Sequence, residues 1–280
     1  MLFYPLLGNK EIPSLLRFGG PGLGNLLFPY CRAYVYSIHY KGTLIPPVWP
    51  TIKFGPLLRA ELDSRLYFGL FNSSLKNKIS CLWALFKHQT VSEELFINNP
   101  EHFKSRDYVV TVRGIGNYFE SLKGYEAPIC LHLLSIINEK VSTKLHTFSN
   151  ESIGLHIRMG DYKEEWRTPM LWYTEQIDLL KQHPKYKDDK IIIFSDGSDT
   201  ELKPLLDRGC QRVTAPDALS DILRLSKCKI IIGSNSTFSA WAAFLSNKPF
   251  IRPNHFYMGR LRSNSELYEG DSLSNLLELI

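Results

Sequence analysis

The stretch IGLHIRMGDY, residues 153–162, decides the fold that we expect for this chain. It begins as a short apolar strand, of the kind that is buried in a parallel sheet. Side chains two apart on a strand share a face, so His156 and Arg158 point the same way. Gly160 then lets the backbone turn before Asp161. The strand therefore delivers a histidine, an arginine and an aspartate to one loop.

That loop predicts an anion site. A guanidinium fork holds phosphate oxygens bidentately and keeps its charge, which suits Arg158 to neutralise a diphosphate. The alternative is structural, because Arg158 could simply pair with Asp161 at the end of the strand. The residues of this stretch alone leave both interpretations open.

Two later segments repeat the pattern of an apolar strand followed by polar side chains. KIIIFSD, residues 190–196, ends in Ser195 and Asp196. KIIIGSNSTFSAWAAFLS, residues 229–246, indicates a strand, a polar loop and a helix. The polar residues at that junction are Ser234, Asn235, Ser236 and Thr237. Backbone N–H groups at a helix start, joined by hydroxyl donors, can bind an anion, although an ordinary helix cap uses the same residues.

Strands and helices are expected to alternate from about residue 151 onward. The apolar patterns predict strands at 152–158, 190–195, 211–215, 228–233 and 249–252, and helices at 170–182, 199–207, 218–227 and 237–246. Such alternation predicts a parallel sheet with helices on both faces. Ligands of these sheets bind at the carboxyl ends of the strands, which is where the three polar segments fall.

A glycine-rich loop lies near the amino terminus, in FGGPGLGNLLFP, residues 18–29. Glycines at 19, 20, 22 and 24 would let the backbone approach a ligand closely. Asn25 stands where G-x-G-x-x-G needs its third glycine, and no Gly-Lys-Ser/Thr follows. A dinucleotide-dependent oxidoreductase is therefore disfavoured, and a plain strand-to-helix turn is the structural alternative.

The length of 280 residues predicts two domains, because single cores stop growing near this size. We place the boundary in the polar FSNE at 148–151, after an expected helix at 127–146.

The net charge of +5 suits an anionic nucleotide sugar or membrane lipid, and the chain has no basic tract typical of nucleic-acid binding. Five dispersed cysteines and the absence of a signal peptide or an apolar run of about 18 residues predict a cytoplasmic protein.

The segment 67–86 mixes aromatic residues with nearby lysines at 76, 78 and 87. This composition is compatible with an amphipathic helix at a bilayer surface, which would give a peripheral membrane contact. Burial of the aromatics in the amino-terminal core is the interpretation that we favour, because apolar helical stripes usually face protein.

Four motifs occur in the order found in bacterial alpha-1,2-fucosyltransferases, and the chain resembles this family. They are GPGLGN at 20–25, HIRMGDY at 156–162, FSD at 194–196 and NSTFSAW at 235–241. The motifs cover the first thirty-odd residues and most of the carboxyl-terminal half. Three positions depart from the family pattern: Leu26 replaces a glutamine, Met159 the second arginine, and Ala240 a tryptophan.

The resemblance implies an α/β protein of GT-B type, with two Rossmann-like domains whose parallel sheets face a central cleft. Residues 1–150 would be the acceptor-side domain with the glycine-rich loop, and residues 151–280 the GDP-sugar domain. The implied reaction is inverting transfer of L-fucose from GDP-fucose to O2 of a terminal galactose in a bacterial surface oligosaccharide, such as an O-antigen. A lipid-linked form of this oligosaccharide is one acceptor that the resemblance allows. Transfer from another nucleotide sugar such as GDP-mannose, or GDP-sugar binding without catalysis, remain the alternatives.

The resemblance also assigns the site residues. Arg158, with His156 and Asp161, is expected at the catalytic centre, where it would stabilise charge on the leaving diphosphate. The expected donor-binding residues are Gly22, Gly24, Asn25, Ser195, Asp196, Asn235, Ser236, Thr237 and Phe238. Asp196 would recognise guanine, because a carboxylate can accept from both N1–H and the exocyclic amine. No metal and no other cofactor is expected, since helix-terminal amides and Arg158 can serve the diphosphate.

Overall fold

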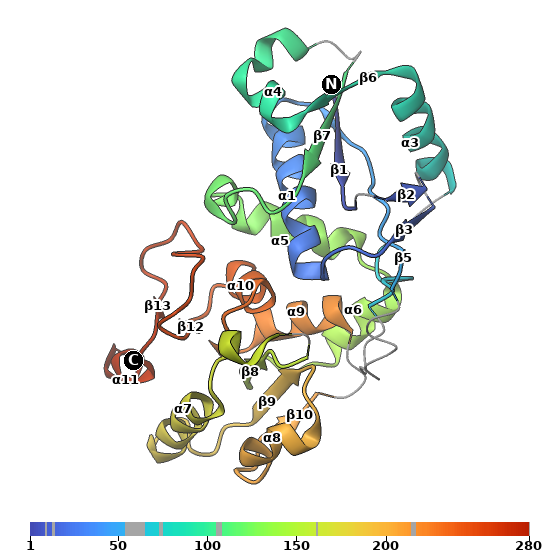
Figure 1. Ribbon diagram of the computed structural model, residues 1–280. Helices are drawn as coiled ribbons and strands as arrows, with labels where there is room; N and C mark the ends of the chain where they lie inside the picture. Colours follow the sequence, from blue (N-terminus) through green and yellow to red (C-terminus); the bar gives the residue numbers. More distant parts are fainter. Residues whose placement is uncertain are drawn as a thin grey trace. The chain divides into compact units, whose positions relative to one another are not determined.

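The computed structural model describes residues 1–8, 10–12, 15–53, 65–72, 75–104, 108–160, 162–213 and 217–279. These residues form two compact units (Figure 1), and the division between the units falls after Ser142. It therefore lies within helix α6 (Glu139–His146). Each unit contains a parallel sheet covered by helices, which confirms the predicted α/β class.

The carboxyl-terminal unit is built on a six-stranded sheet with the order β10-β9-β8-β11-β12-β13. Its strands are β8 (Ile153–Ile157), β9 (Ile191–Ser195), β10 (Gln211–Arg212), β11 (Ile230–Ile232), β12 (Phe250–Ile251) and β13 (Glu269–Gly270). Every neighbouring pair is parallel. This is the order of a doubly wound nucleotide-binding sheet, in which ligands bind where the strand order reverses. The reversal lies between β8 and β11.

The predicted helices of this unit are present as α7 (Met170–Gln182), α8 (Asp199–Leu206), α9 (Ala218–Lys227) and α10 (Thr237–Phe244), and α11 (Leu273–Leu279) follows. A single-turn helix (Glu164–Trp166) precedes α7. Ser198, Asp217 and Ser236 accept hydrogen bonds from the first turns of α8, α9 and α10, which explains where these helices begin.

Strand β8 is buried on both sides because helices cover both faces of the sheet (Figure 1). Leu155 and Ile157 pack into a core that includes Tyr173 of α7 and Leu202 of α8. Gly154 lies on the other face, where a Cβ atom would collide with side chains of α9. His156 shares that second face, because side chains alternate along a strand.

The amino-terminal unit has a four-stranded parallel sheet with the order β4-β1-β7-β6. Its strands are β1 (Leu2–Leu6), β4 (Thr43–Leu44), β6 (Gln89–Ser92) and β7 (Tyr108–Arg113). A second small sheet contains β2 (Glu11–Ile12), β3 (Leu16–Phe18) and β5 (Thr51–Ile52). In the larger sheet the strand order reverses between β1 and β7, so the carboxyl ends of these two strands mark its ligand crevice.

The helices in the described part of this unit are α1 (Leu23–His39), α3 (Leu75–Lys87), α4 (Glu93–Asn98) and α5 (Glu126–Ile136), with single turns at Pro100–Phe103 and Glu120–Leu122. The single helix predicted at 127–146 is wrong, because α5 and α6 are separate. Between them, Ile137 pairs with Phe71 in a β-bridge and the Asn138 N–H donates to the Leu70 carbonyl. These contacts hold the backbone of Ile137 in an extended conformation, which ends α5.

Helix α3 corrects the preferred interpretation of the segment 67–86. Tyr67 and Phe71 are buried as expected, but Trp83 is 65% exposed and Phe86 88% exposed. The reason is rotational: Cys81 lies on the face that packs against the sheet, and the aromatics lie on the opposite face. Burial of these aromatics in the core is therefore wrong for Trp83 and Phe86.

Within the described parts of the chain, no helix has the length and apolar character needed to cross a bilayer.

Candidate active site

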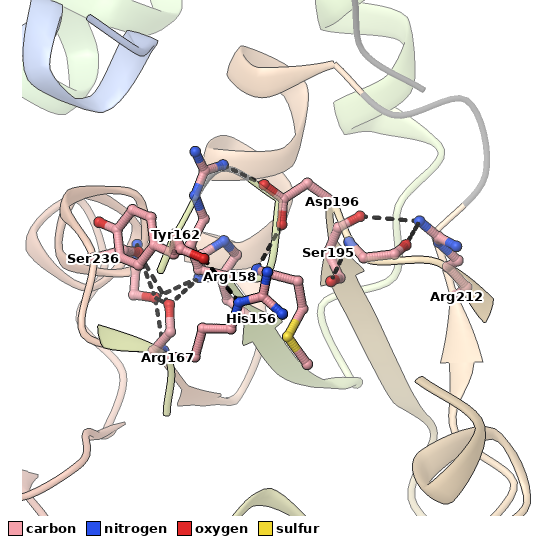
Figure 2. Close-up of polar contacts among 12 residues, drawn as sticks. His156, Arg158, Tyr162, Arg167, Ser195, Asp196, Arg212 and Ser236 are labelled. Carbon is pink, nitrogen blue, oxygen red and sulfur yellow. Dashed lines mark hydrogen bonds and ion pairs between the residues drawn. The ribbon is translucent and has the colours of Figure 1, made fainter. Parts of the chain in front are cut away.

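Polar side chains from three segments meet at the strand-order reversal of the carboxyl-terminal sheet (Figure 2). His156 and Arg158 come from the end of β8, and Asp196 follows β9. Ser236 precedes α10, which follows β11. The three motif segments that the sequence places at strand ends therefore lie together in this unit.

Arg158 is held by Asp196. Its Nη1 lies 2.5 Å from Asp196 Oδ2, and the two side chains are 20% and 17% exposed. Asp196 Oδ1 accepts a hydrogen bond from the Met159 N–H at 2.9 Å, so this carboxylate fixes both the arginine and the backbone beside it. The guanidinium carbon lies 5.1 Å from the ring centre of Tyr162, which covers it. Gly160 is required, because a Cβ there would overlap the Asp196 carboxylate.

This ion pair bears on two predictions from the sequence. Asp161, the expected neighbour of Arg158, lies outside the described residues, so its role stays a prediction. Guanine recognition by Asp196 also stays a prediction. The structure shows that both carboxylate oxygens already have partners within the protein.

The loop after β9 is secured by Arg212, which the sequence did not indicate as a site residue. Its Nη2 donates to the carbonyls of Ser195 and Gly197 at 3.2 and 2.6 Å (Figure 2), and its Nη1 lies 2.5 Å from Asp199. Ser195 Oγ accepts from the Gly197 N–H at 3.0 Å. This clamp positions the Asp196 backbone, because it holds the residues on both sides.

His156 is a buried link between β8 and α10. Its Nδ1 lies 2.6 Å from Ser239 Oγ and 2.9 Å from Ser234 Oγ. Its ring stacks on Phe238 with ring centres 4.5 Å apart. Burial, with the nearby charge of Arg158, lowers the pKa of His156 to about 3. The imidazole is therefore neutral at physiological pH and orders the start of α10.

The start of α10 is a network of serine hydroxyls. Ser236 Oγ accepts from the Ser239 N–H at 3.3 Å and also from Ser234 Oγ at 3.1 Å. Ser236 is thus a helix cap, as the structural alternative proposed. The predicted donor contacts Thr237 and Phe238 form the first turn and are half-buried. The positive end of the α10 dipole is directed to the same strand ends as Arg158.

Asn235 lies in the same junction but its side chain contacts another loop. Its Nδ2 donates to the His255 carbonyl at 3.1 Å, and its Oδ1 accepts from the Tyr257 N–H at 3.4 Å. The residue therefore ties the segment after β12 to the start of α10. Its predicted contact with the donor stays a prediction.

The glycine-rich loop lies in the amino-terminal unit, beside a pocket of about 340 Å³ at the carboxyl ends of β1 and β7. We call this the glycine-loop pocket. Asn25 lines it, together with Lys10 and Arg113. Gly22 caps α1 without a side-chain hydrogen bond, and Gly24 is buried in the first turn. The described lining carries two cations and no acidic side chain, so the pocket favours an anion.

Buried Arg17 supports this loop and was not indicated by the sequence. Its Nε donates to the Val48 carbonyl at 2.6 Å and its Nη2 to the Trp49 carbonyl at 3.0 Å. Gly20 adopts a φ of +97°, and a Cβ there would lie 3.4 Å from the Arg17 guanidinium. The glycine-rich loop is therefore packed around the buried guanidinium of Arg17. The predicted site residues are thus divided between the two units, and in each unit they lie where the strand order of the sheet reverses.

Comparison with solved structures shows the fold. The structure resembles POFUT1 in complex with GDP-fucose, with TM-scores of 0.55 and 0.52 for two crystal forms, 9% identity, and coverage of 90% of this chain and 97% of that chain. It also resembles the fucosyltransferase NodZ from Bradyrhizobium, with a TM-score of 0.54, 14% identity, and coverage of 90% of this chain and 96% of that one. These similarities confirm a GT-B-like fold.

Comparison with sequences gives the family. None of the curated proteins that were compared matches the chain. Residues 75–254 match the model of the family described as Glycosyl transferase family 11. Because this match spans more than half of the 280 residues, the chain belongs to glycosyl transferase family 11.

Proposed function

We propose that the protein transfers L-fucose from GDP-fucose to O2 of a terminal galactose in a bacterial surface oligosaccharide, such as an O-antigen chain of lipopolysaccharide. Family membership establishes glycosyl transfer. The four motifs support an alpha-1,2 linkage, and the resemblance to POFUT1 in complex with GDP-fucose supports the donor. The observation that carries the proposal is Arg158, fixed by Asp196 at the strand-order reversal beside the start of α10.

The proposed reaction is a displacement at the anomeric carbon of fucose. The acceptor oxygen forms a bond to this carbon from the face opposite GDP, which inverts its configuration. The bond between the carbon and the β-phosphate oxygen breaks, and its electron pair passes to GDP. The acceptor hydroxyl loses its proton to solvent or to a carboxylate. The transition state resembles an oxocarbenium ion, as in other glycosyl chemistry.

The residues around Arg158 act on the charge that develops in this step. Negative charge grows on the diphosphate as the bond breaks, and a fixed guanidinium lowers the barrier more than it stabilises the ground state. The amino-terminal end of α10 acts in the same direction. No metal is required in this proposal. His156 is a positioning residue, because its neutral ring holds Ser234 and Ser239 in place.

We also propose a peripheral contact with the inner face of the cytoplasmic membrane, where a lipid-linked acceptor would be reached. The exposed stripe of α3 supports it, because a tryptophan and a phenylalanine on one face suit the bilayer interface. The sequence of α3 contains three lysines and no acidic residue. Such a helix is attracted to anionic lipids.

The test is turnover of GDP-fucose and of GDP-mannose with a panel of galactosides, with and without EDTA. We expect fucosyl transfer that survives EDTA. Arg158→Ala should lower kcat by about 100-fold to 1,000-fold, the usual effect of removing one preorganised donor to a developing anion. Arg208→Ala is the control, because Arg208 also pairs with an aspartate in this unit, at 2.8 Å, but away from the strand ends. Wild-type turnover by Arg158→Ala would contradict the proposal, and turnover of GDP-mannose alone would replace its donor.

A further inference from the structure

A second hollow in the amino-terminal unit has no role in the function described so far. It has a volume of about 720 Å³ and lies where β6 and β7 end, between α1, α4 and the loop 113–117. We call it the β6–β7 groove. Its size is in the range of ligand sites, and the carboxyl edge of a parallel sheet is where such sites form.

The charges of the groove balance, unlike those of the glycine-loop pocket. Among its described lining residues, Arg32 and Arg113 are matched by Glu93 and Glu94. The glycine-loop pocket has Lys10, the shared Arg113 and no acid in its described lining. Whichever hollow Arg113 is assigned to, the groove has no net positive charge and the pocket has one, so the groove suits an uncharged ligand and the pocket a phosphate-bearing one.

The hydrogen-bonding groups of the groove suit a ligand with many hydroxyls. Asn98 and Asn117 supply amides, which both donate and accept. Ser121 adds a hydroxyl group that has no hydrogen-bond partner in the described structure, whereas the hydroxyls of Ser92 and Thr111 bond to the Leu95 N–H and the Val91 carbonyl. The exposed side chain of Ile97 gives an apolar surface for the C–H face of a sugar ring. This mixture of amides, hydroxyls and one apolar patch matches an uncharged saccharide.

The floor of the groove is rigid because Arg32 is buried beneath it. Its guanidinium forms two bonds with the Glu93 carboxylate, at 2.7 and 3.0 Å. It also donates to the carbonyls of Arg113 and Ile115 at 2.6 and 2.9 Å. Gly116 has a φ of +63° and no room for a Cβ beside Arg32. The loop 113–117 is therefore held in one shape, which lowers the entropy cost of ordering it around a ligand.

The same loop forms a wall of both hollows. Gly114 and Ile115 line the glycine-loop pocket, Gly116 and Asn117 line the groove, and Arg113 lines both. A ligand in the groove would therefore adjoin a ligand in the pocket. In a transferase these positions belong to the two substrates. We propose that the β6–β7 groove binds the acceptor saccharide, an inference that rests on the proposed fucosyl transfer.

The test uses the side chains that line only the groove. Asn98→Ala, Asn117→Ala and the double variant remove amides from exposed positions, so the fold should be kept. Kinetics with GDP-fucose are measured on the galactoside of the panel that the wild type uses best. We expect the double variant to raise KM for this saccharide about tenfold or more, since a hydrogen bond contributes about 0.5–1.5 kcal/mol. Its KM for GDP-fucose and its acceptor-independent hydrolysis of GDP-fucose should stay within about twofold. Asn150→Ala, an exposed asparagine of the other unit, is the matched control.

Two results would overturn the assignment while leaving the proposed function intact. One is an unchanged KM for the saccharide in the double variant. The other is a rise in KM for GDP-fucose as large as that for the saccharide, which would assign the groove to the donor. If the wild type transfers fucose to none of the galactosides, the proposed function fails, and the groove assignment fails with it.

Discussion

Asp196→Asn tests whether this carboxylate positions Arg158 or binds guanine. In the structure, one oxygen pairs with Arg158 at 2.5 Å and the other accepts from the Met159 N–H at 2.9 Å. Asparagine has nearly the same size, and its Oδ1 can still accept from Met159, so the loop should keep its shape. Its NH2 group then faces the Arg158 guanidinium, which cannot accept a hydrogen bond, so the substitution breaks the pair with Arg158.

The expected loss follows from the loss of the bond to Arg158. A hydrogen bond to a charged group contributes about 1.5–3 kcal/mol net. Partial exposure of both side chains keeps the effect near the lower end of this range. Because each 1.36 kcal/mol of barrier changes a rate by about tenfold, we expect kcat about tenfold lower.

The assay combines turnover with calorimetric titration of GDP and of IDP, which lacks the exocyclic amine of guanine. We expect the ratio of the two dissociation constants to change by less than about twofold, because Asp196 acts through Arg158. Asp178→Asn is the control, since Asp178 pairs with Arg208 in the same unit but away from the strand ends. Gly160→Ala should resemble Asp196→Asn, because the added methyl would displace the carboxylate. A collapse of the GDP preference with unchanged kcat would refute this reasoning and assign Asp196 to the base.

Three further predictions concern stability and membrane contact. Glu269→Gln should lower the free energy of unfolding by about 3 kcal/mol in urea titrations, because it removes the charge from a buried pair with Arg262 at 2.7 Å. Folding lowers the pKa of His156 from 6.5 to about 3, so the stability that depends on its neutral ring is fully present above pH 6.5. This stabilisation should be lost as pH falls toward 3, by about 1.4 kcal/mol per pH unit, and urea titrations of His156→Gln should lack that part of the slope. In co-sedimentation with vesicles of phosphatidylcholine and phosphatidylglycerol, the wild type should bind and the Trp83→Ser/Phe86→Ser double variant should stay in solution, whereas equal behaviour of the two proteins would contradict a role for α3.

The sequence predicted the carboxyl-terminal unit well because its signals are local. The helix expected at 170–182 has those bounds, and the strand expected at 190–195 is found as Ile191–Ser195. Buried parallel strands have continuous apolar runs, and the polar residues after them end at one edge of the sheet. Arg158, Asp196 and Ser236 meet there for this reason.

Buried Arg17 could not be predicted, because its hydrogen-bond partners are distant backbone carbonyls. It donates to the carbonyls of Val48 and Trp49. A carbonyl carries no side-chain signature, so nothing in the residue types indicates that this position is paired. The orientation of α3 could not be predicted either. The spacing of Trp83 and Phe86 fits a stripe that faces the core or one that faces solvent. In the structure the opposite face of the helix packs on the sheet, so the two aromatic side chains are exposed.

Met159 stands where the family motif has a second arginine, and its orientation explains why this replacement leaves the positive charge of Arg158 at the site unchanged. Its side chain turns away from Arg158 and joins the same core as Ile157, since neighbouring side chains alternate along the strand. It packs close to Gly197, while its N–H still bonds to Asp196. An arginine with this orientation would bury an unpaired charge at a cost of several kcal/mol. In the proposed function, the charge that this segment would present to a diphosphate is therefore that of Arg158, and the dipole of α10 would add to it without any contribution from position 159.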